Sequence, residues 1–157
     1  TLRGEATDGE GDKIDFAKNH ARVFVQEFLK SKEGIMLAVR SKKSFHKYPK
    51  YQKAMEKFLW ESYGSLFGSK TTDISYGPRI FPEYLVRYME HIEGKIGFGW
   101  QSYLMTISLR LELPLKEIVF SIDPPPDIQK GQEVVLHRIW QAKDYLNGFI
   151  QGLRINL

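Results

Sequence analysis

Lysine and aromatic residues are interleaved within residues 40–57, and no other stretch of the chain has residue types so well suited to holding a partner. Between Ser41 and Lys57 there are six lysines and one acid, Glu56, which gives a charge of +5 in 17 residues. Ammonium groups neutralise phosphates, and aromatic rings stack on unpaired bases. The segment therefore predicts a nucleic-acid site that makes backbone contacts and suits single strands. Its candidate residues are Lys42, Lys43, Phe45, His46, Lys47, Tyr48, Lys50, Tyr51 and Lys53.

The positive charge of the chain is local. The whole sequence has a net charge of +4, so the residues outside 41–57 sum to −1. A concentrated patch favours a polyanionic partner, DNA or RNA, over a general attraction to negative surfaces. Lysine outnumbers arginine in it, which suits phosphate contact better than the reading of base edges. A solvated helix entry whose rings turn inward is the competing interpretation.

The carboxyl-terminal segment has the most regular apolar spacing. Val135, Ile139, Ala142, Leu146, Phe149 and Leu153 follow gaps of 4, 3, 4, 3 and 4. This spacing predicts one helix over 130–153 with an apolar stripe. We expect the stripe to pack on the rest of the chain, burying Val135, Ile139, Leu146 and Phe149. Docking of a protein partner through 135–153 is the alternative.

One arrangement of acids and lysine is typical of magnesium-dependent nucleases. Asp73, followed by Glu93 and Lys95, has the spacing in which two carboxylates hold a metal and a lysine assists the attacking water. Such carboxylates belong at strand ends, whereas Glu93 falls where we expect a helix to end. We therefore predict a non-catalytic binding module, and assign no catalytic residue, metal ligand or cofactor. An adaptor subunit of a protein assembly is the first alternative and a small nuclease the second.

The composition excludes several classes of chemistry. There is no cysteine, which rules out disulfides, thiolate catalysis and cysteine-ligated zinc. The longest wholly apolar run, Ile35–Val39, is far too short to span a membrane, so no membrane partner is expected. An intracellular location, cytoplasmic, nuclear or organellar, follows as the expectation. The chain opens at Thr1 rather than Met, which suggests a cut or processed chain.

Apolar periodicity places the remaining helices. Residues 1–12 hold three glycines and four acids and are expected to form a disordered acidic tail, followed by a single globular domain over 13–157. A stripe starting at Ile14 predicts a helix that ends near Gly34. Two further helices are expected after prolines, from Pro49 to Gly68 and from Pro82 to Gly94.

The strands are harder to place. Ile35–Val39 fits a buried strand or a helix, and periodicity does not separate them. Residues 99–113 alternate apolar and polar side chains, which favours a strand over a helix, and Glu117–Ile122 would be its partner. The predicted fold is therefore α+β and mostly helical, with about four helices and a short β-hairpin over 99–122.

Overall fold

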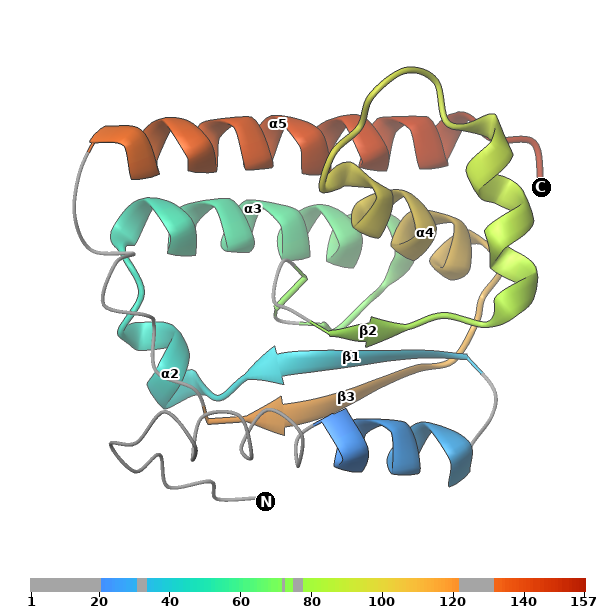
Figure 1. The fold of residues 1–157 in the computed structure, drawn as a ribbon, viewed down its shortest axis with the longest axis horizontal. Coiled ribbons are helices and arrows are strands. Elements are labelled where there is room, and N and C mark those ends of the chain that lie inside the picture. Colours follow the sequence, from blue (N-terminus) through green and yellow to red (C-terminus); the bar gives the residue numbers. More distant parts are fainter. Residues whose placement is uncertain (1–20, 31–33, 72, 75–77, 122–131) are drawn as a thin grey trace.

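The computed structural model describes residues 21–30, 34–71, 73–74, 78–121 and 132–157; the predicted tail lies outside these ranges (Figure 1). The described chain is a mostly helical α+β fold with a small three-stranded sheet, which confirms the predicted class. Residues 21–30 are helical, within the first predicted helix. The elements that follow are β1 (Ile35–Arg40), α2 (Lys42–His46), α3 (Lys50–Phe67), β2 (Arg79–Ile80), the 3-10 helix η1 (Glu83–His91), α4 (Gly99–Arg110), β3 (Leu115–Phe120) and α5 (Gln132–Arg154).

Strand β1 lies at the centre of the sheet. The strand order is β2-β1-β3, with β1 and β3 parallel from Ile35 opposite Leu115 to Arg40 opposite Phe120, and β2 antiparallel to β1. All six residues of β1 are buried, because the sheet is covered on both faces. A strand of this kind reads as a continuous apolar run rather than an alternating one. The apolar run Ile35–Val39 is a buried strand, and its composition alone does not distinguish it from a buried helix.

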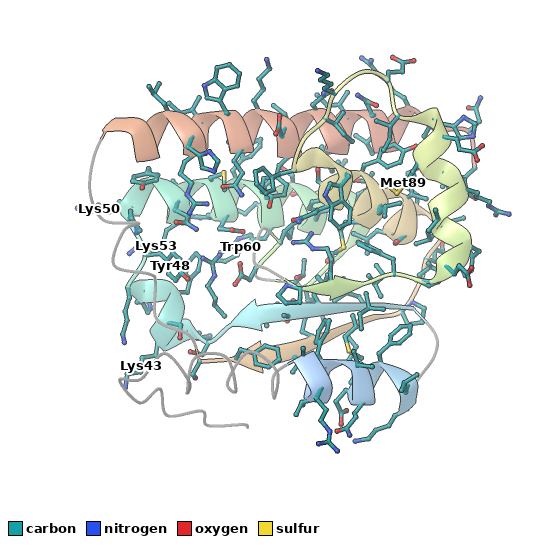
Figure 2. All side chains as sticks on the ribbon, viewed as in Figure 1. Lys43, Tyr48, Lys50, Lys53, Trp60 and Met89 are labelled. Carbon is teal, nitrogen blue, oxygen red and sulfur yellow. The ribbon has the colours of Figure 1, made fainter. Side chains whose placement is uncertain are left out.

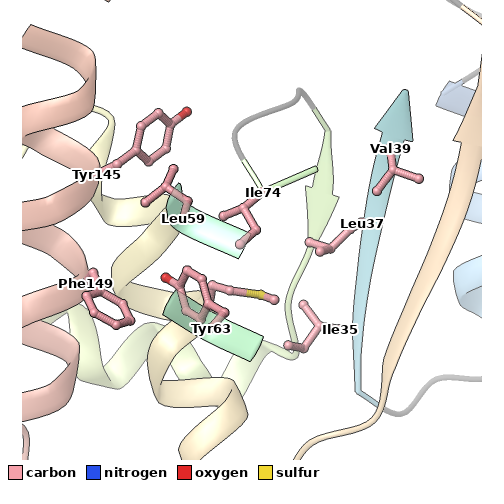
Figure 3. Close-up of a cluster of buried hydrophobic side chains, with 9 residues drawn as sticks. Ile35, Leu37, Val39, Leu59, Tyr63, Ile74, Tyr145 and Phe149 are labelled. Carbon is pink, nitrogen blue, oxygen red and sulfur yellow. The ribbon is translucent and has the colours of Figure 1, made fainter. Parts of the chain in front are cut away.

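Two apolar clusters lie on opposite faces of β1. On one face, Ile35, Leu37 and Val39 meet residues from the three longest helices, including Leu59 and Tyr145 (Figure 3). On the other face, Met36 and Ala38 pack with Phe24, from the helix at 21–30, and with Phe120. The layers are thus one helix, the sheet, and a group formed by α3, α4 and α5 (Figure 1).

The strand predicted over 99–113 is wrong, because Gly99–Arg110 is the helix α4. Residues 102–108 are all buried, so the alternation of apolar and hydroxyl side chains does not mark an inner and an outer strand face. Instead the hydroxyl groups bond to their own helix: Thr106 Oγ1 donates to the Ser102 carbonyl at 2.7 Å, and Ser108 Oγ to the Leu104 carbonyl at 2.7 Å. Hydroxyls satisfied in this way can be buried inside a helical layer.

The predicted β-hairpin over 99–122 is wrong for the same reason. Its second half does form a strand, β3, but that strand pairs in parallel with β1. The link around Pro114 ends α4, with Glu112 in the left-handed region at φ 56° and the Leu113 N–H donating to the Ser108 carbonyl at 3.0 Å. The short link, residues 111–114, therefore joins a helix to a strand.

Helices α4 and α5 pack against each other through small residues. A Cβ built on Gly148 would lie 1.9 Å from the Gly99 carbonyl oxygen, which only glycine permits. Beside it, Ser102 Oγ donates to the Tyr145 carbonyl at 2.6 Å. Because the two backbones touch, the orientation of α5 on the domain is set closely.

Helix α3 confirms the element predicted from Pro49 to Gly68, and it ends at Gly68 in the left-handed conformation. Only some of its large apolar side chains face the core. Leu59 and Tyr63 are buried, but Phe58 and Leu66 are exposed. The inner face is completed by polar side chains, Gln52 and Glu56.

Helix α5 confirms the helix predicted over 130–153, but the prediction that its heptad stripe is buried is wrong for two of three testable residues. Ile139 and Leu146 are 59% and 40% exposed, whereas Phe149 is buried. The side chain of Val135 lies outside the described residues. The face that α5 turns toward the domain is rotated away from the stripe, because contact with α4 requires the small residues Gly148 and Gly152.

Candidate nucleic-acid interface

The lysine-rich segment starts where β1 ends and forms two successive helices. Ser41 accepts a hydrogen bond on Oγ from the Ser44 N–H at 3.2 Å and so caps α2, while the Ser41 N–H donates to the Phe120 carbonyl at 2.8 Å. These contacts tie α2 to the carboxyl ends of the parallel strands. Pro49 then precedes the first turn of α3, where its missing N–H costs nothing.

The lysines of this segment face solvent. Lys42, Lys43, Lys47 and Lys50 are exposed, and Lys53 is partly exposed, with Nζ donating to the His46 carbonyl at 3.2 Å. Figure 2 shows Lys43, Lys50 and Lys53 at the same end of the molecule, near α2 and the start of α3. We call the five residues Lys42, Lys43, Lys47, Lys50 and Lys53 the lysine surface.

The one acid within this segment points away from the surface. Glu56 is 0% exposed and accepts a hydrogen bond from Arg40 Nη2 at 3.0 Å. The negative charge of Glu56 is therefore paired with Arg40 inside the molecule and does not neutralise the charge of the exposed lysines. The exposed part of residues 41–57 is therefore made basic by lysines, with Glu56 buried beneath them.

Two of the three predicted stacking aromatics have other roles. Tyr48 is buried, and its ring centre lies 4.3 Å from Arg40 Cζ. Phe45 is half-buried, with its ring centre 6.0 Å from that of Trp60. The prediction that Tyr48 offers its ring to a base is therefore corrected. Of the predicted rings, Tyr51 and His46 are exposed.

A buried ionic cluster supports the lysine surface from beneath. Asp73 Oδ2 accepts from the Arg40 backbone N–H at 2.8 Å and from Nε at 2.7 Å, and Asp73 Oδ1 accepts from Nη2 at 2.5 Å. Burial acts to lower the pKa of Arg40, but hydrogen bonding and attraction to Asp73, with help from Glu56, outweigh it and raise the pKa. Arg40 thus stays charged and joins β1, α3 and residue 73.

A second arginine lies close to the same carboxylates. Arg79 Nη2 donates to the Ile74 carbonyl at 2.7 Å. Burial lowers the pKa of Arg79, while Tyr145, Tyr63, Glu56 and Asp73 act in the opposite direction. The positive charges of Arg40 and Arg79 are therefore close to the negative charges of Glu56 and Asp73. Sequence reasoning missed this cluster because Glu56 and Asp73 lie 16 and 33 residues from Arg40 along the chain and follow no local pattern.

The residues of the nuclease alternative have different surroundings. Both carboxylate oxygens of Asp73 are bonded to Arg40. Glu93 is exposed, and its backbone N–H donates to Gln151 Oε1 of α5 at 2.9 Å. Lys95 is exposed. Among the described residues, no three His, Cys, Asp or Glu side chains are grouped so that they could hold a metal ion.

Comparison with known proteins returned no match to a protein family, to a curated protein or to a solved structure. Within the described ranges, no helix has both the length and the apolar character needed to cross a membrane.

Proposed function

We propose that this domain is a non-catalytic module that holds nucleic acid, DNA or RNA, by the phosphates of its backbone. The lysine surface supplies the contacts. The observation that carries the proposal is the inward position of Glu56: the one acid of residues 41–57 is buried, while the lysines of α2 and early α3 are exposed. Lysines on two successive helices can follow a flexible chain of phosphates without demanding one rigid geometry.

The start of α3 adds to the attraction. Its first turn contains no acid, and no side chain caps it. The amino end of a helix has a partial positive charge and unpaired N–H groups, which favour anions. Lys47 and Lys50 flank Pro49, the N-cap of this helix, at short range along the sequence. A phosphate here would meet ammonium groups and helix N–H groups together.

Backbone contact is the main mode in this proposal. With Tyr48 buried and Phe45 packed on Trp60, Tyr51 and His46 are left as the rings of the segment that could lie on unpaired bases. Such a surface binds with little sequence preference and depends steeply on salt.

The test compares two charge reversals that change net charge equally. Lys47→Glu/Lys50→Glu alters the lysine surface, whereas Lys70→Glu/Lys95→Glu alters exposed lysines beyond the other end of α3 and after η1. Affinity for single- and double-stranded DNA and RNA is measured as a function of salt. We expect the first variant to bind at least tenfold more weakly and to lose about two units of the slope of log affinity against log salt. The control should keep the slope of the unmodified protein.

Three outcomes contradict the proposal. Equal weakening by both variants would show a response to net charge alone. If no nucleic acid bound at low salt, the proposed function would be wrong. Cleavage of the nucleic acid with Mg²⁺ that disappears in Lys95→Ala would instead favour the nuclease.

Protein docking through α5 is a second candidate function, and the exposure of Ile139 and Trp140 favours it. Apolar docking depends weakly on salt, so the same titrations distinguish the two.

A further inference from the structure

Helix α5 has two faces with different composition. The face toward the domain consists of Gln141, Tyr145, Gly148, Phe149 and Gly152, all buried. These residues include both glycines that contact α4 and two aromatic side chains of the core cluster. One side of α5 is therefore buried against the rest of the domain.

The opposite face is apolar and exposed. Leu136 and Ile139 are 58% and 59% exposed, and Leu146, Ile150 and Leu153 are 40%, 38% and 37% exposed. With exposed Lys143 they follow gaps of 3, 4, 3, 4 and 3, which is an unbroken heptad pattern. We call Leu136, Ile139, Lys143, Leu146, Ile150 and Leu153 the outer seam. Scattered exposed apolar residues are common, but a heptad series along one helix is typical of a helix–helix interface.

We infer that the outer seam pairs with the outer seam of a second copy of this chain, with the two α5 helices antiparallel about a two-fold axis. A two-fold interface uses the same surface on both copies, so the surface must match itself when reversed. The outer seam meets this condition. Leu136 falls opposite Leu153 of the second copy, Ile139 opposite Ile150, and Lys143 opposite Leu146.

Lys143 decides the direction of the pairing. In a parallel pair in register, two Lys143 side chains would share one layer and repel each other within an apolar seam. In the antiparallel pair each Lys143 packs its hydrocarbon stem on a leucine, and its ammonium group can reach water at the edge. The charge pattern of the seam is thus compatible with the antiparallel pair and works against the parallel one.

The seam is long enough for a dimer. Helix α5 has 23 residues, which corresponds to a length of about 34 Å. The exposed parts of its apolar side chains offer on the order of 500 Å² per copy, which is about 1,000 Å² in total and reaches the lower limit for a specific interface, below the roughly 800 Å² per partner of a standard one. Trp140, 67% exposed and next to Ile139, lies at the edge of the seam and extends this area.

The proposed dimer separates the two lysine surfaces. Figure 1 shows that α5 begins at the end of the molecule where α2 and the start of α3 lie. Reversing one α5 against the other places the two lysine surfaces at opposite ends of the assembly. The dimer does not depend on nucleic-acid binding, and its tests need no nucleic acid.

The first test measures mass in solution by sedimentation at increasing protein concentration. The unmodified chain should form dimers at micromolar concentrations, and Ile139→Glu/Ile150→Glu should weaken association at least tenfold because it puts acids into two symmetric layers. Leu66→Glu/Val86→Glu is the control, since these residues are 57% and 58% exposed on other elements. It should leave the dimer intact. Circular dichroism verifies the fold of both variants. A monomer at all concentrations, or equal loss in the control, would overturn the inference.

The second test determines direction through disulfide formation. The chain has no cysteine, so any disulfide that forms must involve the introduced cysteines. Leu136→Cys/Leu153→Cys should give a covalent dimer in air, because the two positions share a layer. Leu136→Cys alone should not, since the two copies of residue 136 would lie about 26 Å apart along the axis. A covalent dimer from the single variant would show a parallel pair and overturn the antiparallel arrangement.

Discussion

The guanidinium of Arg40 lies 4.3 Å from the centre of the Tyr48 ring, inside the molecule. The ring covers a cation that is already bonded to Asp73 and Glu56. A cation over an aromatic face is stabilised more strongly when both are shielded from water. One aromatic residue of the lysine-rich segment thus closes the ionic cluster, and the lysines of the same segment remain outside.

Tyr48→Ala and Tyr51→Ala should therefore have different effects. Tyr48→Ala removes a buried ring and should lower the free energy of unfolding by about 3–5 kcal/mol, with nucleic-acid affinity retained by the folded fraction. Tyr51→Ala should leave the melting temperature unchanged and weaken single-strand binding by about 1–3 kcal/mol, if its exposed ring stacks as proposed. Thermal unfolding and single-strand titrations separate the effects. Loss of affinity without loss of stability in Tyr48→Ala would contradict the buried role of this ring.

Removing one member of the ionic cluster should be far more harmful than removing a surface ion pair. Arg40→Met leaves Glu56 and Asp73 buried without their main partner, and should cost about 3–5 kcal/mol of unfolding free energy. Lys57→Met is the control, because the Lys57–Glu61 pair is exposed and 3.6 Å apart; it should change stability by less than about 1 kcal/mol. Urea denaturation measures both.

Neutralising the carboxylates tests whether the charge itself is responsible. Arg40→Met/Glu56→Gln/Asp73→Asn should recover part of the stability lost in Arg40→Met, because no unbalanced acid remains inside. If the triple variant were less stable than Arg40→Met, hydrogen-bond geometry rather than charge balance would dominate the cluster.

The sequence predicted the class of fold better than its details, for reasons visible in particular residues. Helix α3 lies between Pro49 and Gly68, whose backbone preferences act locally, so the sequence predicts both of its ends. In α4, Thr106 and Ser108 are buried by bonding to their own helix, and their polarity suggested a strand face facing solvent. A polar side chain indicates a solvent-facing position only when no nearby backbone group can form a hydrogen bond with it.

The candidate site shows the same division. The density of lysines between Lys42 and Lys53 is a local property, and the structure places most of them in solvent. The inward position of Tyr48 and Glu56 depends on Arg40 and Asp73, which contact them only after the chain has folded. In α5, the glycines that contact α4 determine which side of the helix is buried. The spacing of the large apolar residues alone therefore predicts the wrong buried face.

Stability should fall at alkaline pH because of a buried tyrosine. Tyr63 is 0% exposed and its hydroxyl donates to the Ser102 carbonyl at 2.9 Å. Burial raises the pKa of Tyr63 above the ordinary value of 10.0, although its hydrogen bond with Thr106 lowers it. The folded state therefore keeps this proton after the unfolded state has lost it. Its contribution to stability is complete below pH 10 and decreases as the pH rises above that value.

Tyr63→Phe isolates that contribution. The variant should lose about 1 kcal/mol at neutral pH, from the lost hydrogen bonds. Above pH 10 its stability should fall less steeply than that of the unmodified chain, by up to about 1.4 kcal/mol per pH unit. Urea denaturation between pH 7 and 11 measures the difference. Parallel curves would show that Tyr63 ionises equally in both states. Burial also raises the pKa of Tyr103 and Tyr145, so the variant should retain part of the slope.

The contact between α4 and α5 should tolerate no side chain at Gly148. The added Cβ of Gly148→Ala would lie 1.9 Å from the Gly99 carbonyl oxygen, so the helices must separate, at a cost of about 1–3 kcal/mol or more. Alanine favours the helical backbone by about 1 kcal/mol, which is too little to compensate. Gly64→Ala in α3 is the matched control, because its nearest neighbour would be 3.4 Å away, an ordinary contact. It should raise the melting temperature slightly, whereas Gly148→Ala should lower it by several degrees. A Gly148→Ala protein as stable as Gly64→Ala would show that α5 does not lie against α4 as described, and the outer seam would then have to be reassigned.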